Sequence, residues 1–198
     1  MRAPDRRAQL LEVAQRVFVR EGSMVSAKVI ADEAGVHEAL LFQHFGSKEN
    51  LFEAAIMEPL ADLVADLNDV VRRLHEDTRP EVRRGLLDQV HTDMLRALTG
   101  IVPLLGIALF SDVPAGRRFY REHLQPALDG ITRATREGTD AWRRPDLDAG
   151  VLATATYGIH FAYAMQAMFA GEVDPERVGP QVADLLWLGQ VGRDPGDG

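Results

Sequence analysis

A short stretch near the N-terminus, residues 38–45, carries side chains that could read the edges of base pairs in DNA. Glutamine can pair with adenine through two hydrogen bonds, and a carboxylate can accept from the amino group of cytosine. Gln43 and Glu38 have these chemistries, and Ala39 or Leu40 could contact a thymine methyl group. Glu38 has a structural alternative, because an acidic residue in the first turn of a helix is favoured by the helix dipole.

Two short helices joined by a tight turn would position these side chains. Ser26 is a suitable N-cap for the first helix, and Val29, Ile30 and Ala34 give that helix an apolar side at helical spacing. Gly35 can adopt the positive φ that a turn requires and that a Cβ would resist. The sequence therefore predicts a first helix that ends at a glycine turn.

The second helix is predicted from about Glu38 to His44, with Leu41 and Phe45 pointing inward. Its outward face then carries Glu38, Ala39, Phe42 and Gln43. Two short helices with a glycine turn form the helix-turn-helix unit, whose second helix lies in the major groove.

The order and spacing of these residues resemble the DNA-binding signature of the TetR family of transcriptional regulators. The segments IADEAGV (30–36) and LLFQHFGSKENLF (40–52) carry the resemblance, which covers about the first 55 residues. The rest of the chain is similar only in length and helical layout. The resemblance implies a homodimer whose final two helices form a four-helix interface, a ligand cavity in the C-terminal helices, and phosphate contacts by Lys28, His44 and Lys48. The full set of residues expected at DNA is Ser26, Lys28, His37, Glu38, Ala39, Leu40, Phe42, Gln43, His44 and Lys48.

Three positions depart from the family pattern. His37 stands where the family usually has Ser or Thr, Leu40 where it has Thr, and Phe42 where it has Tyr. Each usual residue carries a hydroxyl that could reach a phosphate or cap a helix, whereas Phe42 can only pack against the sugar–phosphate edge. The segment between Gly22 and Ser26 is also one residue short. The contacts with DNA are therefore expected to differ from those of the family.

The net charge of −8 argues at first against a nucleic-acid partner, but the acidity is unevenly distributed. Residues 1–52 are neutral, with seven basic and seven acidic side chains, and all the excess acid lies in residues 53–198. The only two lysines, Lys28 and Lys48, belong to the neutral part. A neutral DNA-binding head gives modest non-specific affinity, so two heads acting together are expected.

The remainder of the chain predicts an all-α fold of about nine helices. A helix-turn-helix domain is expected over residues 1–52 (with the motif at about 26–45), a helical regulatory and dimerisation domain over 53–192, and a disordered tail over 193–198. Further helices are predicted at 5–21, 47–74, 80–99, 101–111, 114–139, 149–171 and 175–189. Pro59 is expected to kink or break helix 47–74, Pro103 and Gly106 to break the short apolar segment 101–111, and Pro126 to bend helix 114–139. Helix 47–74 is expected to link the DNA-binding head to the rest.

Residues 149–171 contain no Asp, Glu, Lys or Arg and are long enough to span a bilayer. Their many small and polar residues, and flanks without basic anchors, favour instead a helix buried in a protein. No membrane partner is expected. Small residues suit close helix packing, so this segment and the last helix are the candidate dimer interface, through Val151, Ala155, Gly158, Ala162, Val178, Val182, Leu185 and Leu186.

No catalytic residue, metal site or cofactor is predicted. The chain has no cysteine, and its six histidines do not fall at metal-ligand spacing. His91 and His160 lie on apolar faces, where a core histidine is favoured over a ligand. No apolar secretion signal begins the chain, which predicts a cytoplasmic protein. Aromatic and thioether side chains in the C-terminal helices could line a cavity for a small apolar or aromatic ligand, although core packing is the alternative for each: Met94, Phe110, Tyr120, Tyr157, His160, Phe161 and Met165.

The sequence thus predicts a homodimeric transcriptional repressor that binds a palindromic double-stranded DNA operator and is released by a small molecule. Two other classes stay open. One is a DNA-binding regulator without a ligand, acting as a constitutive repressor or activator. The other is a helical enzyme or interaction module.

Overall fold

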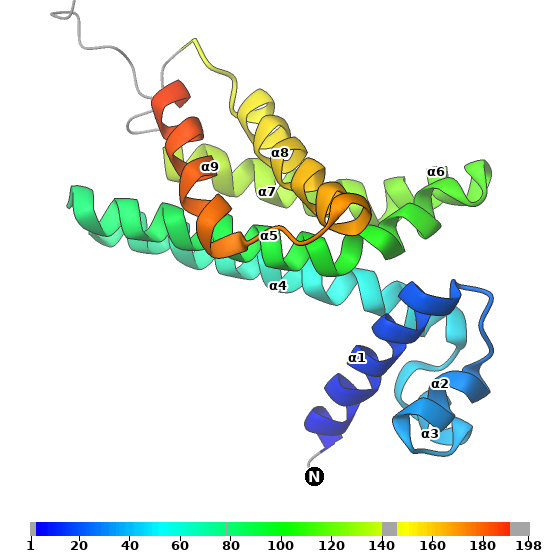
Figure 1. The fold of residues 1–198 in the computed structure, drawn as a ribbon. Coiled ribbons are helices and arrows are strands. Elements are labelled where there is room, and N and C mark those ends of the chain that lie inside the picture. Colours follow the sequence, from blue (N-terminus) through cyan, green and yellow to red (C-terminus); the bar gives the residue numbers. More distant parts are fainter. Residues whose placement is uncertain (1–2, 78, 140–145, 191–198) are drawn as a thin grey trace, which may run out of the picture. The chain divides into compact units, whose positions relative to one another are not determined.

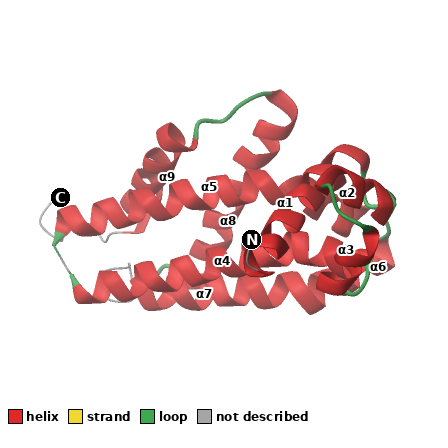
Figure 2. Ribbon diagram, turned by 90° about the horizontal axis from the view of Figure 1, so that it is seen from below, coloured by secondary structure: helices red, strands yellow, loops and turns green. Residues whose placement is uncertain are grey.

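The computed structural model describes residues 3–77, 79–139 and 146–190, which are all-α, as predicted (Figure 2). The predicted tail, 193–198, and most of the loop 142–148 lie outside these residues. The described helices are α1 (Ala3–Glu21), α2 (Ala27–Ala34), α3 (Glu38–Phe45), α4 (Lys48–Glu76), α5 (Pro80–Phe110), α6 (Val113–Phe119), a π-helical segment η1 (Tyr120–Leu124), α7 (Gln125–Thr139), α8 (Ala149–Ala170) and α9 (Pro175–Gln190) (Figure 1).

The chain divides into two compact units. The first comprises residues 1–60 and 103–123, and the second comprises residues 61–102 and 124–198. Helices α4 and α5 therefore each contribute residues to both units. The division after residue 52, which rests on the sequence motif, stays a prediction.

Helix α1 forms the centre of the first unit, because its apolar side chains recur at helical spacing and are fully buried. Leu10, Ala14, Val17 and Phe18 have no exposed surface. The Phe18 ring meets that of Phe52 edge to face, with centroids 5.0 Å apart, an arrangement that aromatic pairs prefer. Helix α1 packs against α2, and α2 packs against α3. The short helices are therefore held by burial rather than by their own length, which is too small for a stable isolated helix.

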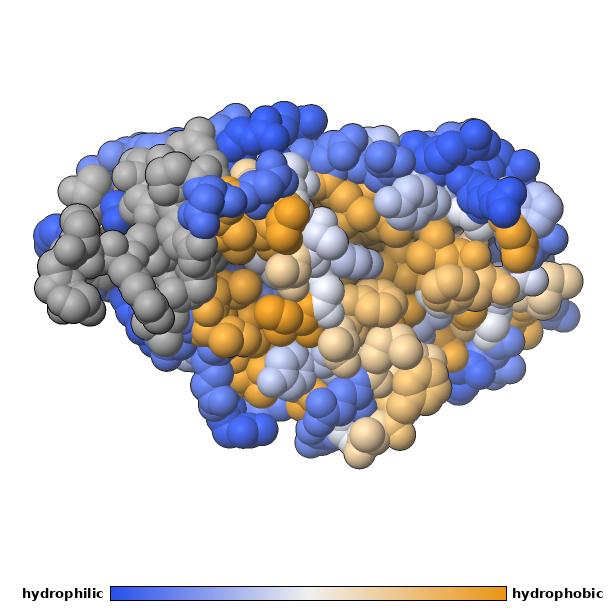
Figure 3. All heavy atoms as spheres, turned by 90° about the horizontal axis from the view of Figure 1, so that it is seen from above, coloured by the Kyte–Doolittle hydropathy of each residue, from blue (hydrophilic) through white to orange (hydrophobic). Residues whose placement is uncertain are grey.

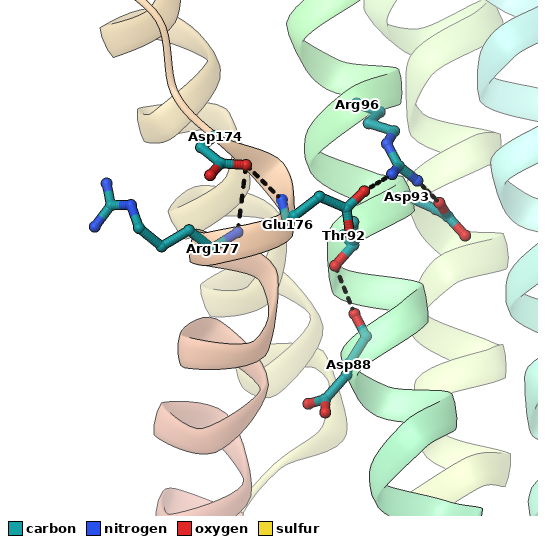
Figure 4. Close-up of polar contacts among 7 residues, drawn as sticks. All are labelled: Asp88, Thr92, Asp93, Arg96, Asp174, Glu176 and Arg177. Carbon is teal, nitrogen blue, oxygen red and sulfur yellow. Dashed lines mark hydrogen bonds and ion pairs between the residues drawn. The ribbon is translucent and has the colours of Figure 1, made fainter.

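In the second unit, α9 begins against α5 (Figure 4). The carboxylate of Asp174 accepts from the backbone N–H groups of Glu176 and Arg177, at 3.0 and 3.4 Å, so Asp174 caps a helix whose first residue is proline. Arg96 of α5 pairs with both Asp93 and Glu176 (Figure 4). These exposed pairs orient α9 and contribute little to stability.

Close packing between α9 and α5 depends on Gly179. A Cβ at Gly179 would lie 2.8 Å from the backbone Cα of Thr92, so no larger residue fits without backbone movement. The Thr92 hydroxyl donates to the carbonyl of Asp88, 2.8 Å away (Figure 4). This approach brings together a core cluster of Leu95, Leu152, Val178, Val182 and Leu186.

The break predicted at Pro103 is wrong. Residues 80–110 form one helix, α5, that continues through Pro103 instead of breaking there. Proline inside a helix costs about 3 kcal/mol, but Ile101, Val102, Leu104 and Leu105 around it are buried, and each such side chain stabilises by about 1.5–3 kcal/mol. Burial therefore outweighs the missing hydrogen bond. Pro59 lies inside α4, which is continuous from Lys48 to Glu76, and the kink that was the other alternative there stays a prediction.

The predicted helix 114–139 is present as a continuous helical stretch with a π-helical segment inside it, and the bend at Pro126 stays a prediction. It consists of α6, the π-helical segment η1 and α7, and Pro126 is the second residue of α7. Proline has no backbone N–H and cannot donate the usual α-helical hydrogen bond. A π-helical turn is wider than an α-helical one, so the backbone before α7 does not need that bond. The proline therefore marks an element boundary.

Helix α8 is not buried on all sides, contrary to the expectation for residues 149–171. Asp148 caps it through the N–H groups of Gly150 and Val151, at 2.8 and 3.0 Å. One face, including Leu152, Thr156, His160 and Ala164, is buried, and α8 packs against α7. The opposite face is exposed, and apolar side chains gather over it (Figure 3).

By length and composition alone, a different helix could cross a membrane: Glu81–Phe110 in α5. Its most apolar positions, among them Leu95, Leu98 and Leu104, are buried. An apolar helix with this burial has the position of a core helix in a protein.

Candidate functional site

The helix-turn-helix is built as the sequence predicts. The Ser26 hydroxyl accepts from the backbone N–H of Val29, and Gly35 ends α2 with φ +66°, a conformation that glycine adopts without strain. The backbone N–H of Val36 then donates to the carbonyl of Ala31, 3.0 Å away. This bond closes the helix end and fixes the turn into α3. The buried face of α2 is Ala27, Ile30 and Ala31, whereas Val29, expected inside, is exposed.

Helix α3 has one buried and one exposed face. Leu41 and Phe45 are buried in the first unit, so the helix cannot rotate about its axis without exposing them. Glu38, Ala39, Phe42 and Gln43 are exposed on the other face, with 41 % of the Phe42 surface accessible, and Leu40 is half-buried. The residues expected to read bases thus share one accessible surface, which we call the reading face.

The start of α3 lacks a side-chain cap. His37 is the N-cap residue and makes no capping hydrogen bond. A Ser or Thr at this position would accept from the first turn, so the N–H groups here remain available to another acceptor. Glu38, in the first turn, favours this helix end through the dipole.

The expected phosphate anchors occupy different environments. Lys28 and His37 are exposed and His44 is half-buried. Lys48 is half-buried, and its ammonium group donates to the carbonyl of Ser23, 3.0 Å away. An ammonium group has three N–H donors, so Lys48 fixes the loop before α2 and retains donors for a further acceptor.

Arg7 positions α3, a role that no local pattern in the sequence indicates. Its guanidinium forms two hydrogen bonds with the Glu58 carboxylate, at 2.5 and 2.6 Å, and lies 4.7 Å from the ring centroid of Phe45. The bond to Glu58 raises the pKa of Arg7. Since Glu58 is 51 residues away, only the folded chain brings the pair together. Arg7 thereby ties α1 and α4 to the residue that anchors α3.

A second site is a cavity of about 70 Å³ inside the second unit. Its wall combines aliphatic side chains with three polar residues and carries no charged group. The lining residues are Leu67, Val70, Val71, Leu74, Leu87, Val90, His91, Met94, Ile131, Ala134, Thr135, Leu152 and Thr156.

Of the residues expected to line a ligand pocket, Met94 lines this cavity. His160 is completely buried directly behind His91, as its hydrogen bond shows. Phe110 and Tyr120 belong to the first unit, where both line a separate open hollow with Val113 and Arg117. Met165 is exposed on α8, and Tyr157 and Phe161 are half-buried there with their rings 5.7 Å apart. Aromatic type alone therefore does not identify the cavity wall, which is mostly Leu and Val.

His91 and His160 form a buried pair, a contact that the sequence did not predict. Nδ1 of His91 lies 3.2 Å from Nε2 of His160, and Nδ1 of His160 lies 2.6 Å from the carbonyl of Thr156. The two rings are nearly parallel, at 14°. Burial, and secondarily the charge of His160, lower the pKa of His91 to about 3. Burial also lowers the pKa of His160, against the hydrogen bonds to Thr156 and His91, which raise it.

The residues expected at a dimer interface fall into two groups. Val151, Ala155, Gly158 and Ala162 lie on the exposed face of α8, and Leu185 is exposed on α9. Val178, Val182 and Leu186 are buried within the chain in the α5–α8–α9 core cluster. Among the residues that the structure describes, no three His, Asp or Glu side chains come together as a metal site could require.

The geometry of the first unit defines a helix-turn-helix protein with an accessible second helix. Residues 10–55 match the family described as "Bacterial regulatory proteins, tetR family". Over these residues the chain is similar to the DNA-binding domain of that family.

Two curated relatives are similar over the same part of the chain. The HTH-type transcriptional activator FasR of Mycolicibacterium smegmatis is 38 % identical over 83 residues, which is 41 % of this chain and 37 % of FasR. The HTH-type transcriptional regulator BetI of Brucella anthropi is 39 % identical over 71 residues, 35 % of this chain and 37 % of BetI. The match thus spans little more than a third of the length of these relatives.

Solved structures are similar over nearly the whole chain. The SmeT–triclosan complex has a TM-score of 0.68 at 20 % identity and covers 97 % of this chain and 96 % of SmeT. A regulator from Saccharomonospora viridis in complex with choline has a TM-score of 0.64 at 21 % identity, and the match covers 96 % of this chain and 100 % of that regulator. FadR from Bacillus subtilis in complex with stearoyl-CoA has a TM-score of 0.67 at 18 % identity, and the match covers 90 % of this chain and 96 % of FadR. At these identities the likeness establishes the fold.

Proposed function

We propose that this chain is a sequence-specific DNA-binding transcriptional regulator that acts as a homodimer on a palindromic operator and is released by a small molecule. The observation that carries the proposal is the reading face of α3. Its polar and small side chains are accessible, while Leu41 and Phe45 hold the helix in one rotation. A helix presented in this way is suited to the major groove.

Within the reading face, Gln43 supplies direct base recognition and Glu38 a second polar contact. The amide of Gln43 can pair with adenine and the carboxylate of Glu38 can accept from cytosine. Phe42 packs against the sugar–phosphate edge. The uncapped N–H groups after His37, together with Lys28, His44 and Lys48, contact phosphates.

Dimerisation uses the exposed face of α8 and the exposed part of α9. Val151, Ala155, Gly158 and Ala162 recur at spacings of three and four residues, which places them along one stripe. A Cβ at Gly158 would meet nothing within 4 Å in the chain, so that position is open to a partner helix. Small residues allow two helices to approach closely, and contiguous exposed apolar surface is typical of an interface.

The ligand releases the protein from DNA by changing the dimer geometry. A small molecule in the second unit shifts the population toward a dimer whose reading faces are wrongly spaced, and a hundredfold loss of DNA affinity requires about 3 kcal/mol of coupling. Helices α4 and α5, which contribute to both units, are the elements available to carry it. The ligand-bound structures of similar fold, with choline, triclosan and stearoyl-CoA, support a ligand in principle and span very different chemistries. The protein would work in the cytoplasm.

A regulator without a ligand is the second candidate, because the cavity is small beside the 300–1,000 Å³ of ordinary ligand pockets. A screen of small molecules by thermal shift separates the two, since a bound ligand raises the melting temperature.

DNA binding is tested by selecting genomic fragments with the purified protein and sequencing them. A regulator enriches fragments with a common inverted repeat. A helical enzyme or interaction module enriches none, and that result would overturn the proposal.

A further inference from the structure

The hydrogen-bond chain behind the cavity fixes which atoms of its two histidines carry protons. The carbonyl of Thr156 can only accept, so Nδ1 of His160, 2.6 Å away, carries a hydrogen. In a neutral imidazole the other nitrogen is then an acceptor. Nε2 of His160 therefore accepts from the group next to it.

That neighbouring group is Nδ1 of His91, at 3.2 Å, which must donate. Its own second nitrogen, Nε2, is consequently an unprotonated acceptor. His91 is 7 % exposed and lines the cavity, and no hydrogen bond joins Nε2 to any described residue. The chain of bonds from the Thr156 carbonyl thus ends at a lone pair of His91, a residue that lines the cavity.

The rest of the wall limits what can meet this lone pair. No carboxylate, lysine or arginine lines the cavity, and aliphatic side chains dominate. An ion placed there would lose its hydration without a partner of opposite charge, which is strongly unfavourable. An uncharged group with an N–H or O–H would instead satisfy His91. Thr135 and Thr156 offer hydroxyl groups that can adapt as donor or acceptor.

We propose that the cavity binds small, uncharged, largely apolar molecules that donate one hydrogen bond to Nε2 of His91, and that His160 is a positioning residue that holds His91 in the accepting tautomer. The volume of about 70 Å³ is roughly half that of an engineered cavity that accommodates benzene. Ligands are therefore of the size of a five-membered ring or smaller in this conformation. The proposal rests on the proposed ligand-responsive function, and it names the ligand class of that site.

The tautomer is measured first, by ¹⁵N NMR of the histidine side chains in the full chain at pH 7. The proposal predicts that both His91 and His160 are protonated at Nδ1 and bare at Nε2. Protonation of His91 at Nε2, or a doubly protonated ring, would overturn it. This measurement requires no variant, so it stands even if substitutions in the core prevent folding.

Binding is measured next with three rings of similar size: pyrrole, a neutral donor; furan, which has no donor; and pyrrolidinium, a cationic donor. Pyrrole is expected to shift the His91 Nε2 resonance and to bind about tenfold more tightly than furan, the value of one hydrogen bond. Pyrrolidinium is expected not to bind. Equal or tighter binding of furan or pyrrolidinium, or no binding of pyrrole up to its solubility limit, would overturn the proposal.

A variant tests the positioning role. His160→Phe removes the acceptor for His91 Nδ1–H, so the His91 tautomers should mix and the preference for pyrrole over furan should fall to about one. The exposed His75→Gln variant is the control and should keep the preference. Since no DNA is present, these results are independent of operator binding, which is measured separately on the same preparations. Failure of either proposal is thereby distinguished from failure of the other.

Discussion

The ammonium group of Lys48, at the start of α4, donates to the backbone carbonyl of Ser23, in the loop that precedes α2, across 3.0 Å. This bond holds the two ends of the helix-turn-helix together. It also explains how a residue expected at phosphate can be half-buried, because one donor serves the fold while the others remain free for DNA.

Replacing Lys48 should therefore change both the affinity for DNA and the salt dependence of that affinity. Lys48→Met is expected to weaken binding to any sequence and to lower the slope of log K against log salt by about 0.9, the effect of one lost phosphate contact. The measurement is fluorescence anisotropy with labelled duplex over a salt series. Lys28→Met, at an exposed position, is the matched comparison and should lower the slope equally. An unchanged slope for Lys48→Met would show that Lys48 contacts no phosphate and serves only its hydrogen bond with Ser23.

Gln43 should control sequence preference. Gln43→Ala is expected to cost about 1–3 kcal/mol on the selected operator and almost nothing on unrelated DNA, because base contacts give specificity and phosphate contacts do not. Competition binding with operator and scrambled duplexes measures both. Gln125→Ala, an exposed glutamine of α7, is the control. Equal losses on both duplexes would place Gln43 at the DNA backbone instead.

Gly35 should be required for its backbone conformation alone. Its φ is +66° and a Cβ there would meet nothing within 4 Å, so Gly35→Ala is expected to lower the free energy of unfolding by about 1–2 kcal/mol. Gly100→Ala, in open space inside α5, should instead raise it by about 0.5–1 kcal/mol. Urea unfolding compares them. A neutral Gly35→Ala would show that the turn can rearrange.

The buried histidines should make the protein sensitive to acid. The folded-state pKa of His91 is about 3, below the ordinary 6.5, so between these values the unfolded chain binds a proton that the folded chain does not. The free energy of unfolding should therefore be flat above about pH 7 and fall below it, by about 1.4 kcal/mol per pH unit for this histidine. Urea unfolding at pH 7, 6 and 5 measures the slope. His91→Gln should reduce the slope, whereas His75→Gln should preserve it; identical slopes in all three proteins would contradict the assignment.

The exposed face of α8 should control the oligomeric state. Val151 and Val113 are both 60 % exposed, but only Val151 belongs to the proposed interface. Val151→Asp is expected to shift a dimer to monomer and to weaken operator binding, while Val113→Asp leaves the mass unchanged. Sedimentation equilibrium measures this. A dimer that survives Val151→Asp and its equivalent at Ala155 would move the interface elsewhere.

The helix-turn-helix could be predicted because its signals are local. Ser26, Gly35 and Gly46 mark helix ends within a few residues of the chain, and the spacing of four residues between Leu41 and Phe45 gives the buried face of α3. Two glycines there indeed have positive φ, +66° and +79°. These helix ends and the buried face of α3 needed no knowledge of distant residues, whereas Val29 of α2 was placed on the wrong face.

The cavity and the positioning contacts could not be predicted, because they join residues far apart in the chain. Arg7 meets Glu58 across 51 residues, and His91 meets His160 across 69. The break predicted at Pro103 failed for a related reason: the effect of a proline depends on the burial of its neighbours. Similarly, Leu185 is exposed whereas Val182 and Leu186 are buried, although all three were expected at the dimer interface.

The central claim is that two copies of the α3 reading face enter the major groove of one duplex. Hydroxyl-radical footprinting of the protein on a selected operator tests it most directly. We expect two protected regions related by symmetry, with centres one helical turn, about 10 base pairs, or a multiple of it apart, and weaker protection at the same protein concentration with Gln43→Ala. A single asymmetric footprint, or protection that persists unchanged with Gln43→Ala, would contradict it.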